Sequence, residues 1–162
     1  MLTVYTDGSS RPQTTGAAGW AFATNLGDRV HVVYGHLPPP STNNIGELTA
    51  LLVPLRLLSK AKNPFPLKFI TDSQYVQKGI NEYMVGWKRR GWKTASGAKV
   101  KNLELWKEIY SLWNPKLHTV EWVRGHNGDP GNELADVWAN AGSDNKHDTI
   151  DTSGLLVRRS NG

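Results

Sequence analysis

Alternating and continuous apolar stretches predict five strands, each bounded by Gly, Pro, Asn, Asp or Ser. The predicted strands are residues 2–6, 17–24, 30–36, 67–71 and 116–123. The second and third are joined through Asn25-Leu26-Gly27-Asp28, a typical hairpin connection. Two of the five, 2–6 and 67–71, are each followed directly by an aspartate and then by a small turn residue.

Helical spacing of apolar residues predicts four helices in the remaining chain. The first begins at a cap supplied by Asn43 or Asn44 and continues to about residue 58, and Pro54 is expected to kink it or end it early. The other three predicted helices are residues 73–81, 102–113 and 132–141. Strands come first and then alternate with helices, so we expect an α/β fold with a five-stranded mixed sheet and helices on both faces.

The 162 residues fit one domain of ordinary size. We expect a catalytic domain over residues 1–142, followed by a loosely held tail over residues 143–162 that is rich in Asp, Ser, Thr and Asn. The chain has no cysteine, which excludes disulfides, thiolate metal sites and a cysteine nucleophile. No apolar run approaches the roughly 18 residues of a membrane span, and the first residues do not form a signal peptide. A cytoplasmic protein is therefore expected, and a monomer is the default expectation for its assembly.

The positive charge is concentrated in one segment. The net charge is +5, yet residues 84–101 hold six basic residues and no acidic one, which leaves −1 for the rest of the chain. This basic segment contains Lys88, Arg89, Arg90, Lys93, Lys99 and Lys101. Glycines interrupt it, so it is expected to form a short helix and then a projecting loop. Trp87 and Trp92 lie among the charges and are expected to be exposed, a combination that favours a nucleic-acid partner over a merely solvated loop.

Four acidic residues form the candidate chemistry. Asp7 and Asp72 follow two strands that are expected to be parallel neighbours, so their carboxylates should emerge side by side. Glu47 lies in the first turn of the first helix, and Asp136 lies in the last helix. Taken singly, each acid is explained as a turn, a cap or a solvent-facing residue. The pairing of the two strand ends favours a site instead.

Six segments, in order from about residue 3 to residue 142, resemble bacterial type 1 ribonuclease H, and their joint occurrence makes the resemblance strong. They are Thr6-Asp7-Gly8-Ser9, Thr42-Asn43-Asn44-Ile45-Gly46-Glu47-Leu48, Thr71-Asp72-Ser73-Gln74-Tyr75-Val76, Trp87-Lys88-Arg89-Arg90-Gly91-Trp92-Lys93, Trp122-Val123-Arg124-Gly125-His126 and Asn132-Glu133-Leu134-Ala135-Asp136. The resemblance implies a ribonuclease H-like fold and a metal-dependent endonuclease. Such an enzyme cuts the RNA strand of RNA–DNA hybrids and leaves 3′-hydroxyl and 5′-phosphate ends.

The resemblance also assigns roles to the acids and to a histidine. Asp7, Glu47, Asp72 and Asp136 would be the metal ligands, and His126, between Gly125 and Gly128, would assist turnover. Physical chemistry agrees, because clustered carboxylates repel one another by about 4 kcal/mol per 4 Å pair unless cations neutralise them. An all-oxygen ligand set selects Mg²⁺, with Mn²⁺ as a substitute. Two such ions about 4 Å apart suit an in-line phosphoryl displacement.

Recognition of the hybrid requires groups that read the 2′-hydroxyl across a shallow minor groove. The resemblance points to Asn43, Asn44 and Gln74 as these readers. Thr42 resembles the threonine of the family's phosphate pocket, and it would grip the DNA strand together with the basic segment. The chain departs from the family in the turn after Asp7 and at Pro40, where a basic residue is usual, and Arg11 is expected to compensate there.

Two other functions stay open from the residues alone. A non-catalytic hybrid-binding module would use the basic segment and would be expected to have lost one of the four acids. Another nuclease of the same fold, such as a junction resolvase or a proofreading exonuclease, is the second alternative. The exonuclease normally carries Asp-x-Glu on its first strand, whereas Asp7 is followed here by Gly8 and Ser9.

Overall fold

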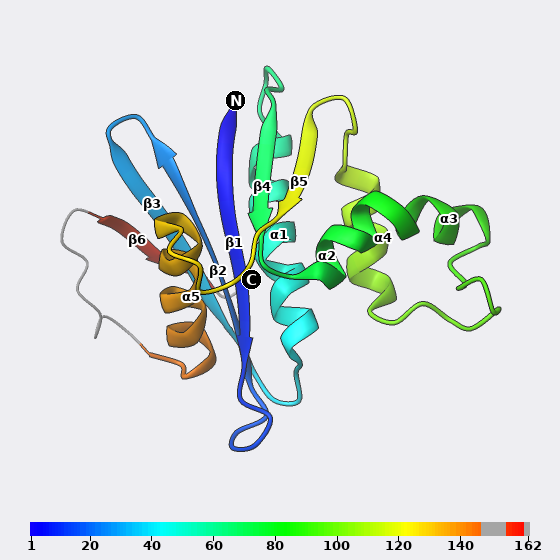
Figure 1. Cartoon of the computed structure of the whole chain (residues 1–162), viewed down its shortest axis with the longest axis horizontal. Helices are drawn as coiled ribbons and strands as arrows, with labels where there is room; N and C mark the ends of the chain where they lie inside the picture. The colour runs from blue at the N-terminus through cyan, green and yellow to red at the C-terminus, as the bar shows by residue number, and fades with distance from the viewer. Residues whose placement is uncertain (147–154, 161–162) are drawn as a thin grey trace.

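The computed structural model describes residues 1–146 and 155–160. Within these residues six strands form one mixed sheet in the order β5-β4-β1-β2-β3-β6 (Figure 1). The elements in chain order are β1 (Leu2–Ser10), β2 (Ala18–Leu26), β3 (Arg29–Leu37), α1 (Asn43–Ser59), β4 (Leu67–Thr71), α2 (Gln74–Lys78), the π-helix η1 (Gly79–Tyr83), α3 (Met84–Arg89), α4 (Leu103–Leu112), β5 (His118–Trp122), α5 (Pro130–Ser143) and β6 (Leu155–Arg159). The expected α/β class is confirmed, with one strand more than the predicted five.

The sheet carries helices on both faces because successive side chains of a strand point to opposite sides. On β2, Trp20 and Phe22 join the larger hydrophobic core with α1, whereas Ala21 and Ala23 join a second core with Trp138 of α5. Strands β1, β2 and β3 are antiparallel neighbours, and β4 pairs with β1 in parallel. Helix α1 connects β3 to β4, which lies beside β1 and parallel to it (Figure 1).

Asp7 lies inside β1, not after its end as the sequence suggested. Parallel pairing between β1 and β4 stops at Thr6 opposite Thr71, but β1 continues to Ser10 against β2, with Asp7 opposite Ala21. Antiparallel pairing with β2 therefore extends the strand through the predicted turn. The expected side-by-side arrangement still results, because Asp7 and Asp72 are each the first residue beyond the parallel pairing.

Helix α1 corrects two details of the sequence prediction. Its cap is Thr42, whose Oγ1 accepts from the Ile45 N–H at 3.1 Å, and Asn43 and Asn44 are already helical. The helix also continues past Pro54 to Ser59. Pro54 is buried with the leucines around it, so burial of this helix face offsets the backbone hydrogen bond that proline cannot make.

The segment after β4 is less regular than the single helix predicted over residues 73–81. It forms α2, one π-helical turn and then α3, which carries the first part of the basic segment. A loop follows and projects from the body of the molecule beside α4 (Figure 1). Trp87 and Trp92 are partly buried, contrary to the expected exposure. Trp87 packs edge-on against Trp106 at 5.3 Å between ring centroids, and Trp92 packs edge-on against Tyr110 at 5.8 Å.

The sixth strand comes from the predicted tail. β6 pairs in parallel with β3, with Val32 opposite Val157, and Val157 packs against the α5 side of the sheet. Residues 147–154 and 161–162 of the tail lie outside the described residues. The boundary between domain and tail at residue 142 stays a prediction. Among the described residues, no helix is both long enough and apolar enough to cross a membrane.

Candidate active site

Close packing between β1 and the first turn of α1 brings Glu47 to Asp7. Gly8 makes this approach possible, since a Cβ at position 8 would lie 2.3 Å from the Glu47 nitrogen and 2.5 Å from the Gly46 carbonyl carbon. The Gly8 N–H donates to Asp7 Oδ1 and to Glu47 Oε1, both at 2.9 Å. One backbone amide therefore holds two carboxylates in place.

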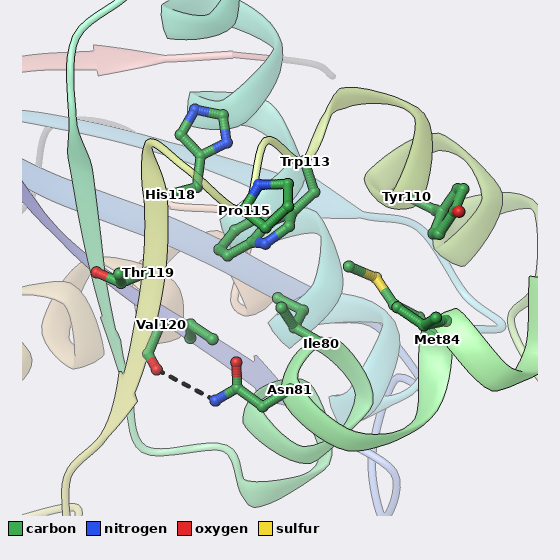
Figure 2. Close-up of a pocket in the computed structure, with 10 residues that line it drawn as sticks. Ile80, Asn81, Met84, Tyr110, Trp113, Pro115, His118, Thr119 and Val120 are labelled. Carbon is green, nitrogen blue, oxygen red and sulfur yellow. Dashed lines mark hydrogen bonds between the residues drawn. The ribbon is translucent and has the colours of Figure 1, made fainter.

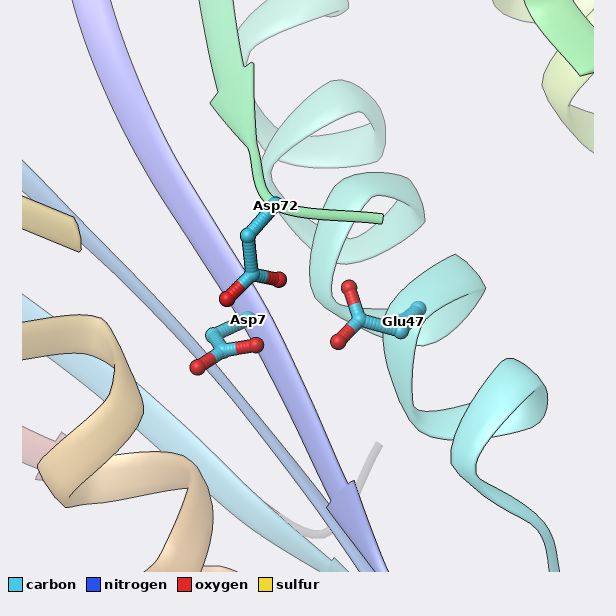
Figure 3. A group of neighbouring side chains, drawn as sticks. All are labelled: Asp7, Glu47 and Asp72. Carbon is cyan, nitrogen blue, oxygen red and sulfur yellow. The ribbon is translucent and has the colours of Figure 1, made fainter. Parts of the chain in front are cut away.

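Three of the predicted acids form a cluster. Oxygens of Asp7, Glu47 and Asp72 all lie within 4.8 Å of one another, and Figure 3 shows the three carboxylates converging from β1, α1 and the end of β4. Asp136, from α5, borders the same cavity of about 390 Å³. The structure thus brings the four predicted acids together from four separate elements.

Burial makes this cluster electrostatically unfavourable by itself. Asp7 and Glu47 are only 2% and 3% exposed, and desolvation followed by the neighbouring carboxylates raises the pKa of Asp7. Desolvation also raises the pKa of Glu47 and of Asp72, and the charge of Asp136 adds to both shifts. Asp7 Oδ2 and Glu47 Oε2 are buried without a hydrogen-bond partner among the described residues. Oxygens that are buried, close together and unsatisfied fit a hard divalent cation.

His126 and Asn43 border the same cavity as the acids. His126 is exposed, and its charge acts to lower the pKa of Asp72 against the dominant effect of burial. The backbone of His126 is left-handed, with φ of 56°, in the loop before α5. Gly125 lets this loop pass close to the cluster, since a Cβ there would lie 2.9 Å from Asp72 Oδ2.

The remaining predicted binding residues lie outside this cavity. Thr42, Asn44 and Gln74 are exposed at the starts of α1 and α2. The Thr42 hydroxyl accepts the capping hydrogen bond of α1. The basic residues of the segment are exposed on α3 and the loop after it, namely Lys88, Arg89, Arg90, Lys93, Lys99 and Lys101.

Two contacts at the site have no counterpart in the sequence prediction. Trp122 Nε1 donates to the backbone carbonyl of Asp72 at 3.0 Å, which ties the end of β5 to the end of β4. Arg11, expected at the phosphate pocket, instead pairs with Asp144 at the end of α5. The sequence did offer a signal for the Trp122 contact, because Trp122 lies four residues before His126 in the same motif. The contact between Arg11 and Asp144 joins residues that are too distant in sequence for a local pattern to reveal it.

A larger cavity, of about 790 Å³, lies between η1, the end of α4 and β5 (Figure 2). Its lining is mainly apolar and includes Met84, Trp113 and Val120, and Asn81 Nδ2 donates there to the Val120 carbonyl at 3.5 Å. None of the predicted site residues borders it. Size alone would favour this cavity as the active site. The converging carboxylate oxygens favour the smaller cavity beside Asp7, Glu47 and Asp72 instead.

Comparisons with known proteins agree with the geometry. The RNase H family model matches residues 1–144. Ribonuclease H of Cupriavidus necator is 46% identical over 141 residues, which cover 87% of this chain and 94% of the relative. LC9-RNase H1, a solved type 1 RNase H with the type 2 active-site motif, superposes with a TM-score of 0.74 at 25% identity, over 97% of this chain and 86% of that one.

A second solved structure supports the fold. LC11-RNase H1, determined in complex with an RNA/DNA hybrid, has a TM-score of 0.66 at 18% identity and covers 90% of this chain and 98% of its own. The family model spans β1 through α5 and therefore every element that contributes an acid. The chain therefore belongs to the ribonuclease H family, and it is a nuclease that hydrolyses the RNA strand of RNA–DNA hybrids.

Proposed function

We propose that the hydrolysis is metal-dependent and that Asp7, Glu47, Asp72 and Asp136 hold the cations, with Mg²⁺ as the natural ion and Mn²⁺ as a substitute. The observation that carries this proposal is the pair of buried oxygens, Asp7 Oδ2 and Glu47 Oε2, which have no hydrogen-bond partner among the described residues. Protein atoms do not offset their desolvation, so a bound divalent cation is the natural counter-charge. When bound there, such a cation lowers the pKa of water and stabilises the charge that develops on the phosphate.

The protein's own groups orient the reaction. The Gly8 amide holds one oxygen each of Asp7 and Glu47, and their other oxygens have no hydrogen-bond partner among the described residues. His126 is exposed at the rim and is free to transfer a proton toward the leaving oxygen or to assist product release. The products of this reaction are a 3′-hydroxyl and a 5′-phosphate.

The proposed binding groups divide between the two strands of the hybrid. Asn43 at the cavity, the adjacent Asn44, and Gln74 at the start of α2 would read the 2′-hydroxyls of the RNA strand. Thr42 and the exposed cations of the basic segment would hold the phosphates of the DNA strand. Because Trp87 and Trp92 pack on the protein core, we assign them to support of the basic segment more than to base stacking.

Cleavage of an end-labelled RNA–DNA hybrid tests the proposal. Hydrolysis is expected to require Mg²⁺, to stop with chelator, and to fall on the order of 10²-fold or more in Asp72→Asn and Asp136→Asn. Glu133→Gln is the matched control, since Glu133 is exposed on the same helix as Asp136. Full activity in chelator, or in Asp72→Asn, would contradict the metal assignment.

Substrate choice and assembly are tested separately. Hybrid, duplex DNA and duplex RNA of one sequence distinguish this activity from that of a resolvase or an exonuclease, because only the hybrid is expected to be cut.

The bacterial origin of the relative supports a cytoplasmic enzyme. We further propose a monomer, and gel filtration at several concentrations would reveal a larger assembly.

A further inference from the structure

The C-terminal end of α5 carries a charge of the wrong sign. Asp144 is the residue after the last helical turn, and its N–H donates to the Asn140 and Gly142 carbonyls. A helix C-terminus bears partial negative charge, so a carboxylate there is unfavourable unless a cation compensates it. Arg11 supplies that cation from the turn that follows β1.

Arg11 uses its whole guanidinium within the protein. Its Nε and Nη2 donate to the two oxygens of Asp144 at 2.8 and 3.1 Å, a bidentate pair. Nη1 donates to Ser9 Oγ at 2.9 Å and to the Ser10 carbonyl at 3.1 Å, and Nη2 also donates to Asn140 Oδ1 at 2.9 Å. These contacts account for the five N–H donors of an arginine. The same pairing holds the pKa of Asp144 below its ordinary value.

This set of contacts reaches the active site. Asn140 Oδ1 also accepts from Ser9 Oγ at 2.7 Å, and Asn140 Nδ2 donates to the backbone carbonyl of Asp136 at 2.9 Å. Ser9, Ser10 and Asp136 all border the cavity that holds the acids. The guanidinium therefore links the strand that carries Asp7 to the helix that carries Asp136.

Close backbone contact by itself does not fix the position of α5 along the sheet. Gly19 of β2 lets the helix backbone approach, since a Cβ there would lie 2.2 Å from the Ser143 nitrogen, and Gly142 does the same toward Gly35 of β3. Such contacts fix how near the helix lies to the sheet. Directional polar contacts, among them His36 with the Gly142 carbonyl and Arg11 with Asp144, help to fix its position along the sheet, and Asp136 depends on that position for its distance from the other acids.

We propose that Arg11 is a positioning residue for the nuclease reaction: its clamp on Asp144, Asn140 and Ser9 sets α5 against β1 and so places Asp136 in the metal site. The inference rests on the proposed function, because it requires Asp136 to be a ligand. Arg11 takes no part in binding phosphate, since its donors are already occupied. It acts through Asp136 and touches neither substrate nor metal.

The test is a double-mutant cycle of Arg11→Ala and Asp144→Asn, with kcat, KM for the hybrid, and Mg²⁺ affinity by calorimetry. Each single variant is expected to lower kcat on the order of tenfold and to weaken Mg²⁺ binding, with KM unchanged. The double variant is expected to be no worse than the worse single one, because both remove the same clamp. Arg11→Lys keeps the charge but not the fork of donors, so it should fail to restore kcat.

Arg56→Ala is the matched control. The Arg56–Glu108 pair is also bidentate, joins α1 to α4 away from the acids, and has side-chain exposures of 36% and 39%, close to the 28% and 37% of Arg11 and Asp144. Arg56→Ala should lower the unfolding temperature about as much as Arg11→Ala does, and it should leave kcat and the affinity for Mg²⁺ unchanged. If Arg11→Ala changes stability alone, as this control does, the clamp does not position the site.

Two other results are decisive. A raised KM and a flatter salt dependence in Arg11→Ala, with kcat intact, would make Arg11 a phosphate-binding residue and overturn the clamp. Failure of the proposed function has a different signature, since Asp136→Asn would then bind Mg²⁺ and cut the hybrid like the unchanged protein. A loss in Asp136→Asn without any loss in Arg11→Ala would reject the positioning role alone.

Discussion

The N–H of Gly8 donates to Glu47 Oε1 at 2.9 Å, and the two residues approach this closely because position 8 has no side chain. Gly8→Ala would place a Cβ 2.3 Å from the Glu47 nitrogen, where rigid backbone must move. We expect the variant to lose about 1–3 kcal/mol of unfolding free energy and most of its hydrolysis. Denaturant unfolding and cleavage at saturating hybrid measure the two effects.

Gly86→Ala is the control for that substitution. A Cβ at Gly86 meets only the flexible end of Arg90, at 3.2 Å, in the interior of α3. Alanine is a better helix former than glycine, so this variant should be as stable as the unchanged protein or slightly more stable. Equal stabilities of Gly8→Ala and Gly86→Ala would mean that α1 does not press on β1.

The raised pKa values of the buried acids determine how the stability of the metal-free protein is expected to depend on pH. Burial raises the pKa of Glu47 to about 7 and that of Asp7 further. A carboxyl whose pKa is raised by folding contributes fully to stability below its unfolded pKa, near 4, and loses this contribution as pH rises through the folded value. The free energy of unfolding in chelator is therefore expected to fall from pH 5 to pH 8, as urea titrations at each pH would show.

Removal of one acid should reverse that loss. Without metal near pH 8, Asp7→Asn is expected to be more stable than the unchanged protein by about 1–3 kcal/mol, because folding no longer has to bury or protonate this carboxyl beside the other acids. Added Mg²⁺ should raise the unfolding temperature of the unchanged protein but hardly that of the variant. Asp28→Asn, an exposed turn substitution, is the control. A metal-free protein that gains stability between pH 5 and pH 8 would refute the electrostatic account.

The basic segment should govern affinity and leave the chemistry intact. Replacement of Lys88, Arg89 and Arg90 by alanine is expected to weaken hybrid binding and to make the slope of log K against log salt shallower by up to about 3. Turnover at saturating hybrid should stay near that of the unchanged protein. The control replaces three exposed lysines of other segments, Lys60, Lys62 and Lys116. An unaltered salt slope in the variant of Lys88, Arg89 and Arg90 would show that this segment does not contact the phosphates.

The convergence of the acids could be predicted from the sequence because it depends on strand direction. Two strands that each precede an aspartate, joined through a crossover helix, place Asp7 and Asp72 side by side whatever the exact ends of the strands. The error over the extent of β1 therefore did not alter the site. The role of Glu47 came from the family resemblance, and the structure brings this residue to the site because β1 approaches the first turn of α1.

The features that sequence patterns missed depend on distant partners. Trp87 was expected to be exposed because its neighbours are charged, yet Trp106 of α4 supplies a partner that local sequence does not reveal. Val157 becomes part of a strand only because the edge of β3 is available to pair with it. Arg11 forms its clamp with Asp144 across more than 130 residues, so neither charge predicts the other.

His126 should affect turnover more than affinity. It is exposed at the rim of the acid cavity, on a loop that Gly125 brings against Asp72, and this position suits proton transfer or product release. His126→Ala is expected to lower kcat by about 10–100-fold with little change in KM, measured by steady-state cleavage of the hybrid. Asn127→Ala, an exposed neighbour in the same loop, should keep kcat. Equal kcat values for the two variants would leave His126 without a role in turnover.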